Sequence, residues 1–182
     1  MSTSFDYSTV SGLKLVAFDL DGTIWDPEMY QLWGGGGPPF RVAPNGVDLI
    51  DANNTVVRLL GLSSQILDDI KHNSDLCEPK IAWVSRCDEP EWANACLHLF
   101  VTQPGRVPLS QIADSSEIYH ANKQVHFRNL KKQFPDIDYS EMLFYDNQMD
   151  NIQAGAKLGV KCVFCPDGMT AEAWEQGLQQ FR

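Results

Sequence analysis

Hydrophobic positions along the chain fall into two alternating patterns. Short apolar runs are typical of buried β-strands, and most of them are separated by segments with helical spacing of apolar residues. The runs are Leu13–Leu20, Ile81–Val84, Glu117–Tyr119, Met142–Tyr145 and Lys161–Phe164, and the helical segments are roughly Ser64–His72, Pro90–Phe100, Asn122–Phe134, Asp150–Leu158 and Thr170–Phe181. This alternation predicts a three-layer α/β fold, in which helices cover both faces of a Rossmann-like parallel sheet.

Polar residues and helix breakers mark the ends of several of these helices. Asp88 and Glu91 have the spacing of a capping box, which predicts that their side chains cap the start of the helix over Pro90–Phe100. Pro135 follows the next helix, and Gly159 ends the one after it. These signals agree with the helix lengths that the apolar pattern predicts.

The stretch over about residues 25–60 departs from the alternation, because it contains no helical pattern. Short runs at Phe40–Ala43, Val47–Ile50 and Thr55–Leu59 are separated by Asn-Gly and Asn-Asn, which are typical of hairpin turns. We expect a small antiparallel flap of two or three strands here, directly after the first strand, and no cap domain. The Gly34–Gly37 run and the two prolines after it predict mobility in this flap.

The length and charge of the chain limit its class. With 182 residues it can form one domain with a sizeable core, so we expect a single domain over residues 1–182. The formal net charge of −10 argues against a nucleic-acid surface. No apolar run has the length of a bilayer span, and the polar N-terminal residues lack a signal-peptide pattern. We expect a cytoplasmic monomer or weak homodimer without nucleic-acid or membrane partners.

The cysteines have a structural rather than a chemical interpretation. Their number, five, is odd, and the chain carries no secretion signal, so reduced thiols are expected. Cys162 and Cys165 have CxxC spacing, but they lie inside an apolar run without a second CxxC or paired histidines. Buried, inert thiols are therefore favoured over a metal or redox site.

Two aspartates at the end of the first apolar run carry the clearest chemical signal. Asp19 and Asp21 are followed by Gly22 and Thr23, so the pair lies where a buried strand opens into a loop, the usual position of a site in an open α/β sheet. Carboxylates this close repel each other unless a cation lies between them, and a hard cation such as Mg²⁺ prefers oxygen ligands. With magnesium bound, one carboxylate can act as a nucleophile and the other as an acid and base.

Three further polar motifs follow later strands. Ser85 and Arg86 end the second run, where a hydroxyl and a guanidinium can donate hydrogen bonds to phosphoryl oxygens. Lys123 opens the helix after the third run, and its role depends on its surroundings. Asp146 and Asn147 end the fourth run and add oxygen ligands that a Mg²⁺ site needs.

This ordered set of motifs resembles the haloacid dehalogenase superfamily, and more closely the eukaryotic magnesium-dependent phosphatases of its acid-phosphatase-like branch. It covers essentially the whole chain and consists of Phe18-Asp19-Leu20-Asp21 with Trp25, Pro38-Pro39-Phe40, Ser85-Arg86, Lys123 with His126-Phe127, and Asp146 with Asn151. The resemblance implies a Mg²⁺-dependent phosphatase that hydrolyses phosphomonoesters through an aspartyl phosphate. It implies phosphotyrosine in proteins or sugar phosphates, including phosphorylated glycation adducts, as substrates, and the sequence does not separate them.

The resemblance and the physics of phosphoryl transfer together imply a role for each site residue. Asp19 would attack phosphorus, and Asp21 would protonate the leaving oxygen and then deprotonate the attacking water. Mg²⁺ would be held by Asp19, the main-chain carbonyl of Asp21, and Asp146. Phosphoryl oxygens would be bound by Ser85, Lys123, Thr23 and the amides around Leu20, whereas Arg86 would either add a clamp or lie on the surface.

One position departs from the family pattern. The branch usually carries two aspartates at the end of the fourth strand, whereas the second is Asn147 here. Either Asn147 supports the site as a neutral side chain, or Asp150 takes over through the Asp-x-x-x-Asp spacing that other members of the superfamily use. Somewhat weaker metal binding is the expected consequence.

A receiver-type phospho-acceptor domain without true turnover is the alternative function. Such domains also place acidic pairs, a lysine and an aspartyl phosphate on an α/β sheet. Their phosphorylated aspartate follows the third strand, whereas the third run here, Glu117–Tyr119, ends without an aspartate. The presence of Asp21 as an acid also favours turnover over a stable phosphoprotein.

Histidines and aromatic residues outside these motifs have simpler interpretations. Surface or packing positions are expected for His72, His98 and His120, and core positions for Trp83, Trp92 and Trp174. Three aromatic residues lie between the catalytic loop and the flap, where they are candidates for stacking on a leaving group, namely Trp25, Tyr30 and Trp33.

Overall fold

A five-stranded parallel sheet forms the centre of the structure, a computed structural model that describes residues 5–182. Its strands are β1 (Leu15–Phe18), β6 (Lys80–Ser85), β7 (Ser115–Ile118), β8 (Met142–Asp146) and β9 (Lys161–Phe164). They lie in the order β7-β6-β1-β8-β9, and every neighbouring pair is parallel. The predicted α/β fold with a parallel sheet is confirmed, and β1 is its central strand.

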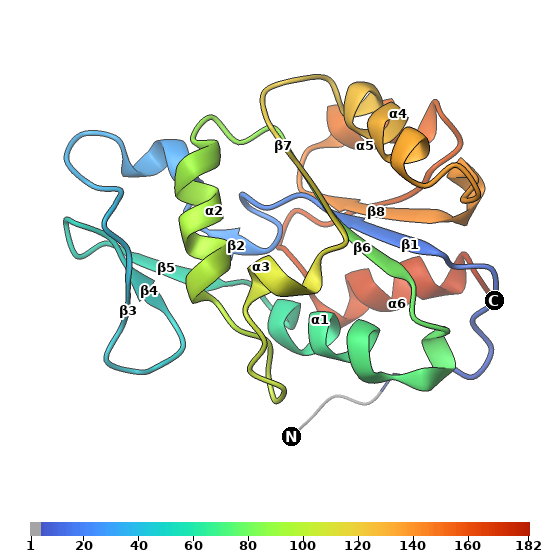
Figure 1. Cartoon of the computed structure of the whole chain (residues 1–182), viewed down its shortest axis with the longest axis horizontal. Coiled ribbons are helices and arrows are strands. Elements are labelled where there is room, and N and C mark those ends of the chain that lie inside the picture. Colours follow the sequence, from blue (N-terminus) through green and yellow to red (C-terminus); the bar gives the residue numbers. More distant parts are fainter. Residues whose placement is uncertain (1–4) are drawn as a thin grey trace.

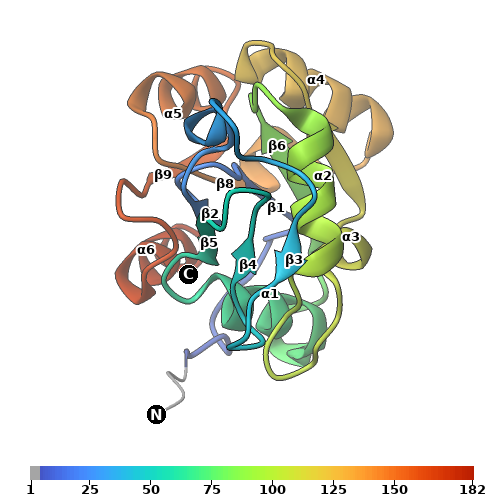
Figure 2. The same cartoon turned by 90° about the vertical axis from the view of Figure 1, so that its left-hand side faces the viewer.

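Helices cover both faces of this sheet (Figure 1 and Figure 2). They are α1 (Ser63–His72), α2 (Pro90–Leu99), α3 (Leu109–Ile112), α4 (Lys123–Gln133), α5 (Met149–Ala156) and α6 (Ala171–Gln179). Leu15 and Ala17 of β1 belong to the core under α4 and α5, whereas Val16 and Phe18 belong to the core under α1 and α6. Because β1 is buried on both faces, its sequence is a continuous apolar run rather than an alternating one.

The helix starts show one side-chain cap that was not predicted and contradict one that was. The side chain of Thr170 caps α6 by accepting a hydrogen bond from the Ala173 amide at 3.1 Å. The predicted capping box of Asp88 and Glu91 is wrong, because the N-cap of α2 is Glu89, which makes no side-chain cap hydrogen bond. Pro90 occupies the first turn, where its lack of an N–H costs nothing, and this start places Asp88 outside the helix.

A second, antiparallel sheet forms the flap. Its strands are β2 (Trp25–Asp26), β3 (Arg41–Val42), β4 (Leu49–Ile50) and β5 (Val56–Leu59), in the order β2-β5-β4-β3. It extends from the end of the parallel sheet, on the left of Figure 1. The flap has one strand more than expected, and a 3₁₀-helix, η1 (Met29–Leu32), where no helix was predicted. The additional strand is β2. Both β2 and η1 are too short to produce a hydrophobic period, so the sequence pattern does not reveal them.

The glycine-rich run is anchored at its end by a buried carboxylate. Asp51 is fully buried, and its Oδ2 accepts a hydrogen bond from the Gly37 amide at 2.9 Å. Its Oδ1 accepts a further bond from the Thr55 amide at 2.7 Å, so one side chain joins the run to the β4–β5 turn. Gly37 has a φ of +86°, and a Cβ there would lie 2.5 Å from the Trp92 ring, so this position requires glycine. The mobility expected for the run as a whole stays a prediction.

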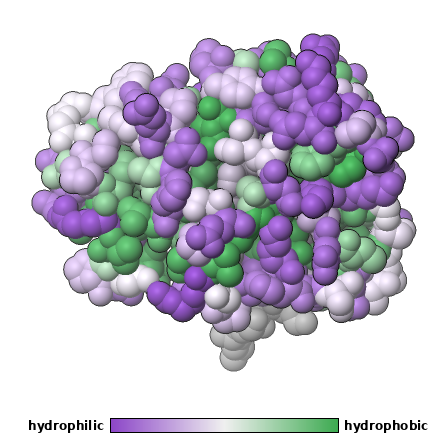
Figure 3. All heavy atoms as spheres, in the orientation of Figure 1, coloured by the Kyte–Doolittle hydropathy of each residue, from purple (hydrophilic) through white to green (hydrophobic). Residues whose placement is uncertain are grey.

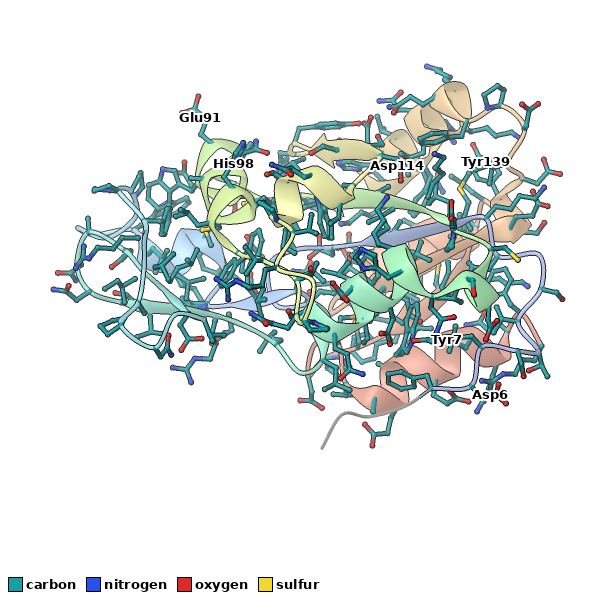
Figure 4. The ribbon with its side chains drawn as sticks, turned by 60° about the horizontal axis from the view of Figure 1, so that its bottom comes forward. Asp6, Tyr7, Glu91, His98, Asp114 and Tyr139 are labelled. Carbon is teal, nitrogen blue, oxygen red and sulfur yellow. The ribbon has the colours of Figure 1, made fainter. Side chains whose placement is uncertain are left out.

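The remaining surface adds few contacts that bear on the site. Figure 3 shows hydrophilic side chains over much of one face, with hydrophobic residues between them. Tyr7, which precedes β1, lies against α6 (Figure 4), and its hydroxyl donates to Asp69 at 2.9 Å and accepts from Trp174 at 3.0 Å.

Within residues 5–182, no helix is long and apolar enough to cross a membrane. All five cysteines are free thiols.

Candidate active site

The carboxyl ends of three neighbouring strands bring the predicted motifs together. Asp19 directly follows β1, Ser85 ends β6 and Asp146 ends β8, and the backbone pairing of β1 with both neighbours fixes their relative positions. Lys123 is the first residue of α4. Residues separated by more than a hundred positions in the sequence therefore meet at one edge of the sheet, as expected for an open α/β fold.

Lys123 is the centre of this arrangement. Its side chain is fully buried, and its ammonium lies 2.7 Å from Asp19 Oδ1 and 3.1 Å from Asp146 Oδ2. It also donates to the Val84 carbonyl at 2.5 Å. An ammonium has three donors, and these three acceptors match them. The structure thus places Lys123 on the two carboxylates, and its expected contact with phosphoryl oxygens stays a prediction.

Asp146 is held on its other side by residues of the loop and helix that follow it. Its Oδ1 accepts hydrogen bonds from the Gln148 amide at 2.8 Å and from Asn151 Nδ2 at 3.1 Å. The Asn151 amide also lies 3.0 Å from Asp146 Oδ2. Asn151 itself accepts from Arg86 Nη1 at 3.1 Å, so it joins the arginine to the buried carboxylate.

Asp21 is held by contacts from three segments. The indole Nε1 of Trp25 donates to Asp21 Oδ1 at 2.7 Å, and the Cys87 thiol and the Met29 amide also hydrogen-bond the carboxylate. Trp25 is fully buried, with its ring stacked on Phe100 at 6.1 Å between centroids. Stacking of Trp25 on a leaving group is therefore wrong, because the ring belongs to the core and only its N–H faces the site.

A cavity of about 270 Å³ opens beside these residues. Of the residues expected in the site, Asp19, Asp21, Ser85 and Arg86 line it. Ser85 is almost fully buried, and its hydroxyl accepts from the Cys87 amide at 3.2 Å. A phosphate group in this cavity would meet Asp19, Asp21 and Ser85 together.

Arg86 lines this cavity and contacts residues of α5, and the phosphate clamp expected of it stays a prediction. Its guanidinium donates to Asn151 at 3.1 Å and to Asp150 Oδ2 at 3.3 Å. Asp150 is exposed and pairs with Arg86, and no contact of its own with Asp146 appears among the described residues. The alternative in which Asp150 takes over from Asn147 stays a prediction.

Six expected residues lie outside the cavity lining, namely Leu20, Thr23, Lys123, Asp146, Asn147 and Asp150. Thr23 is fully buried, and its hydroxyl accepts from the Asn147 amide at 3.1 Å, which ties the loop after β1 to the loop after β8. The Asn147 side chain hydrogen-bonds Glu28 of the flap. Among the described residues, Asn147 Oδ1 is buried without a hydrogen-bond partner. The supporting role expected of Asn147 as a neutral side chain stays a prediction.

Residues that the sequence interpretation did not place in the site form the rim of the cavity. They are Glu28, Tyr30, Cys87, Asp88, His120 and Gln148. Asp88, which was expected to cap a helix, instead faces His120 at 3.7 Å. His120 is exposed, so its expected surface position is confirmed. Trp33 points elsewhere, because its indole donates to Glu89 at 2.9 Å. No motif contains these rim residues. Among them, only Tyr30 was a candidate from the sequence, because it lies between the catalytic loop and the flap.

The site carries more negative charge than its buried cation can offset. Burial, together with the charge of Asp19, raises the pKa of Asp21 to about 6, although the bond from Trp25 lowers it. Burial and the charge of Asp19 also raise the pKa of Asp146 to about 7, against the effect of Lys123. Among the described residues, Lys123 is the only buried lysine or arginine. A divalent cation would offset the excess charge of these carboxylates.

The donor set fits a hard cation such as Mg²⁺. Asp19 and Asp146 contribute carboxylate oxygens at the same strand ends, and oxygen ligands are those that Mg²⁺ prefers. Within residues 5–182, no three His, Cys, Asp or Glu side chains form a metal group by themselves. The expected ligand set of two side chains and a main-chain carbonyl stays a prediction.

Solved structures share this fold. A haloacid dehalogenase-like hydrolase of Streptococcus pneumoniae aligns with a TM-score of 0.55 and 10% identity over 91% of each chain. The N-terminal part of a Bacteroides fragilis protein, which contains a phosphatase domain complexed with Mg, aligns with a TM-score of 0.56 and 18% identity. That alignment covers 94% of this chain and 42% of the other. The fold is that of the haloacid dehalogenase-like hydrolases.

The sequence comparisons identify the family within this class. The family model described as Acid Phosphatase matches residues 12–182. The chain is also 33% identical to human Magnesium-dependent phosphatase 1 over 168 residues, which are 92% of this chain and 86% of the human protein. The chain therefore belongs to the acid phosphatase family, as its motifs implied, and is a phosphatase of the haloacid dehalogenase type.

Proposed function

We propose that the protein is a Mg²⁺-dependent phosphomonoester hydrolase that acts through an aspartyl phosphate on Asp19. The observation that carries this proposal is the position of Asp19, which lines the cavity while Lys123 holds its Oδ1 at 2.7 Å. A carboxylate held in this way has one oxygen fixed by the protein and the other available to the substrate. Membership of the acid phosphatase family favours this function over a receiver-type domain.

The first step transfers the phosphoryl group to the protein. An oxygen of Asp19 forms a bond to phosphorus as the bond from phosphorus to the leaving oxygen breaks, and the electron pair of that bond stays on the leaving oxygen. Asp21 gives its proton to this oxygen. Its raised pKa of about 6 allows a protonated fraction near neutral pH, which a general acid needs. Ser85, at the cavity wall, donates to a phosphoryl oxygen.

The second step releases phosphate. Asp21, now ionised, takes a proton from a water that attacks phosphorus, and the bond between phosphorus and Asp19 breaks. Asp19 returns as a carboxylate that Lys123 again stabilises. Asp19, Asp146 and the main-chain carbonyl of Asp21 would hold Mg²⁺, which when bound offsets repulsion between the nucleophile and the phosphate dianion.

The rim of the cavity favours a hydroxylated leaving group such as a sugar. It contains the carboxylates Glu28 and Asp88, the amide of Gln148 and the His120 ring, all of which can hydrogen-bond hydroxyl groups. The negative charge of this rim disfavours acidic phosphopeptides. Phosphotyrosine remains a second candidate, because the exposed Tyr30 ring also lines the cavity and offers an aromatic contact.

A panel of phosphate esters tests both the activity and the substrate class. With Mg²⁺, kcat/KM should be measured for hexose phosphates, an acidic phosphotyrosine peptide and p-nitrophenyl phosphate, each also with excess chelator. We expect activity to vanish with the chelator. With Mg²⁺, kcat/KM should be higher for the sugar phosphates than for the peptide. Asp88→Asn should reduce the difference in kcat/KM between the sugar phosphates and the peptide. Absence of turnover for every ester would refute the proposed function, whereas a preference for the peptide would refute only the substrate class.

The covalent intermediate has its own test. Asp21→Asn should slow hydrolysis of the intermediate, because the base that activates water is lost, a role typically worth about 10²–10⁴-fold. Rapid quenching of this variant during turnover of p-nitrophenyl phosphate should therefore trap a phosphorylated protein. Peptide mapping should place the phosphoryl group on Asp19, and a label on another residue would refute the assignment.

A further inference from the structure

Trp25 is tied to the catalytic loop by both its backbone and its side chain. Its amide donates to the Leu20 carbonyl at 3.2 Å, and its carbonyl accepts from the Gly22 amide at 2.8 Å. Its indole Nε1 donates to Asp21 Oδ1 at 2.7 Å. The residue is also the first of β2, where it pairs with Leu59 of β5, so it belongs to the flap and to the catalytic loop together.

The ring of Trp25 has little freedom to move. It is fully buried, and it stacks on Phe100, which follows α2, with an angle of 22° between the ring planes. An indole fixed in this way directs its N–H along one line. The carboxylate that accepts this bond is consequently limited to one orientation of its side chain, because a hydrogen bond weakens steeply away from linear geometry.

We propose that Trp25 is a positioning residue for the general acid, which keeps the Asp21 carboxyl aimed at the leaving oxygen of the substrate. This inference rests on the proposed role of Asp21 in the phosphatase reaction. Trp25 does not touch the substrate, since it is absent from the cavity lining. Its effect should therefore depend on how much the leaving oxygen needs a proton, rather than on how the phosphoryl group is bound.

The leaving group separates positioning from a purely structural role. A p-nitrophenolate departs without protonation because its negative charge is delocalised, whereas an alkoxide from an alkyl or sugar phosphate requires a proton from the acid. Loss of the indole N–H should therefore slow alkyl esters more than p-nitrophenyl phosphate. A general loss of packing would slow both esters by the same factor.

Trp83 provides a matched control within the same chain. It is almost fully buried and packs on Phe18 at 6.2 Å between ring centroids, much as Trp25 packs on Phe100. Among the described residues, its Nε1 has no hydrogen-bond partner. Trp83→Phe thus removes the same atoms from the core as Trp25→Phe without removing a bond to Asp21.

The experiment measures kcat and KM of the wild-type protein, Trp25→Phe and Trp83→Phe with Mg²⁺ on p-nitrophenyl phosphate and glycerol 3-phosphate. For Trp25→Phe, kcat/KM should fall at least about tenfold more on the alkyl ester than on the aryl ester, because kcat/KM reports the transfer of the phosphoryl group to Asp19 and not the later hydrolysis that is common to both esters. For Trp83→Phe, the two esters should change by the same factor. Equal losses for both esters in Trp25→Phe would overturn the proposal.

A spectroscopic measurement checks the contact without catalysis. In a ¹H–¹⁵N spectrum, the Trp25 indole signal is the one that Trp25→Phe removes, and Asp21→Asn should shift it while leaving the Trp83 signal in place. A Trp25 signal that does not respond to Asp21→Asn would overturn the proposal. A wild-type protein inactive on both esters would refute the proposed function and the role of Trp25 together. If the wild-type protein is active and Trp25→Phe loses the same factor on both esters, only the role of Trp25 is refuted.

Discussion

The parallel sheet and the flap border the same cavity, but different interactions build them. Every residue of β8 is buried, and the sheet side of the site is a network of buried charges around Lys123. Both residues of β3 are exposed, and the flap joins the rest of the molecule through buried apolar side chains, such as Met29 and Leu49, and a few polar contacts. The polar contacts between the flap and the rest of the molecule include the indole of Trp25 on Asp21, that of Trp33 on Glu89, and the Asn147 side chain on Glu28. The bonds of Asp51 lie within the flap.

The sheet and the flap therefore have different roles in the proposed reaction. The sheet fixes the nucleophile and the ligands of the expected metal, because a buried ionic network tolerates little rearrangement. The flap supplies Glu28 and Tyr30 to the rim and Trp25 to the acid, so it acts on the leaving group. Changes on the sheet side should therefore affect all esters, whereas changes in the flap should alter the ranking of esters.

The largest effect is expected for Asp19→Asn on the sheet side. Hydrolysis of p-nitrophenyl phosphate should fall by roughly 10⁴-fold or more, because an amide does not form the covalent intermediate. Circular dichroism should show an intact fold. Asp26→Asn, an exposed position of the flap strand β2, is the control and should keep near-normal activity. Near-normal turnover by Asp19→Asn would remove this residue from the mechanism.

Lys123→Met should cause the largest loss of stability. The substitution leaves Asp19 and Asp146 buried without their shared cation, which typically costs about 3–5 kcal/mol in the free energy of unfolding. Lys131→Met on the same helix is the control, because its pair with exposed Asp138 at 3.0 Å should contribute less than about 1 kcal/mol. Urea unfolding measures both variants, and equal losses would contradict the central role of Lys123.

Asp51→Ala should destabilise the flap while sparing the chemistry of the sheet. The amides of Gly37 and Thr55 lose their acceptor, which should cost about 1–3 kcal/mol in urea unfolding. Hydrolysis of p-nitrophenyl phosphate should stay within roughly tenfold of wild type, because that ester depends mainly on the phosphoryl site. Asp48→Ala, which removes a mostly exposed contact with Asn45, is the control. An equal loss for every ester in folded Asp51→Ala would place the flap in the catalytic apparatus.

The smallest effect is expected at the contact between the two regions. Asn147→Asp restores the usual family residue but sets a second carboxylate against Glu28, and it should cost about 1 kcal/mol through like-charge repulsion. Adding Glu28→Gln should recover most of this loss, with a coupling energy of about 0.5–3 kcal/mol in a double-mutant cycle. Additive effects of the two substitutions would show that Asn147 and Glu28 do not interact.

The sheet could be predicted from the sequence more completely than the flap. A strand buried on both faces requires a continuous apolar run, so the three central strands β6, β1 and β8 are clear in the pattern. The edge strand β7 is partly exposed and begins two residues before the predicted run Glu117–Tyr119. The strand β2 and the helix η1 have no pattern of their own, because elements of two and four residues do not complete a period. The same reason explains why the rim residues Glu28 and Asp88 could not be predicted, since they lie in short connections outside every motif.

The sequence by itself determined the class of fold and the chemistry at the strand ends. The Asp19-Leu20-Asp21 motif, Ser85, Lys123 and Asp146 each follow or open a predicted element, and parallel strands place such residues at one edge. Only the tertiary structure decided that Lys123 lies on the two carboxylates, that Trp25 binds Asp21 and that Asn147 faces Glu28. Those contacts depend on distances between side chains on separate elements, and a periodic pattern along one chain carries no information about such distances.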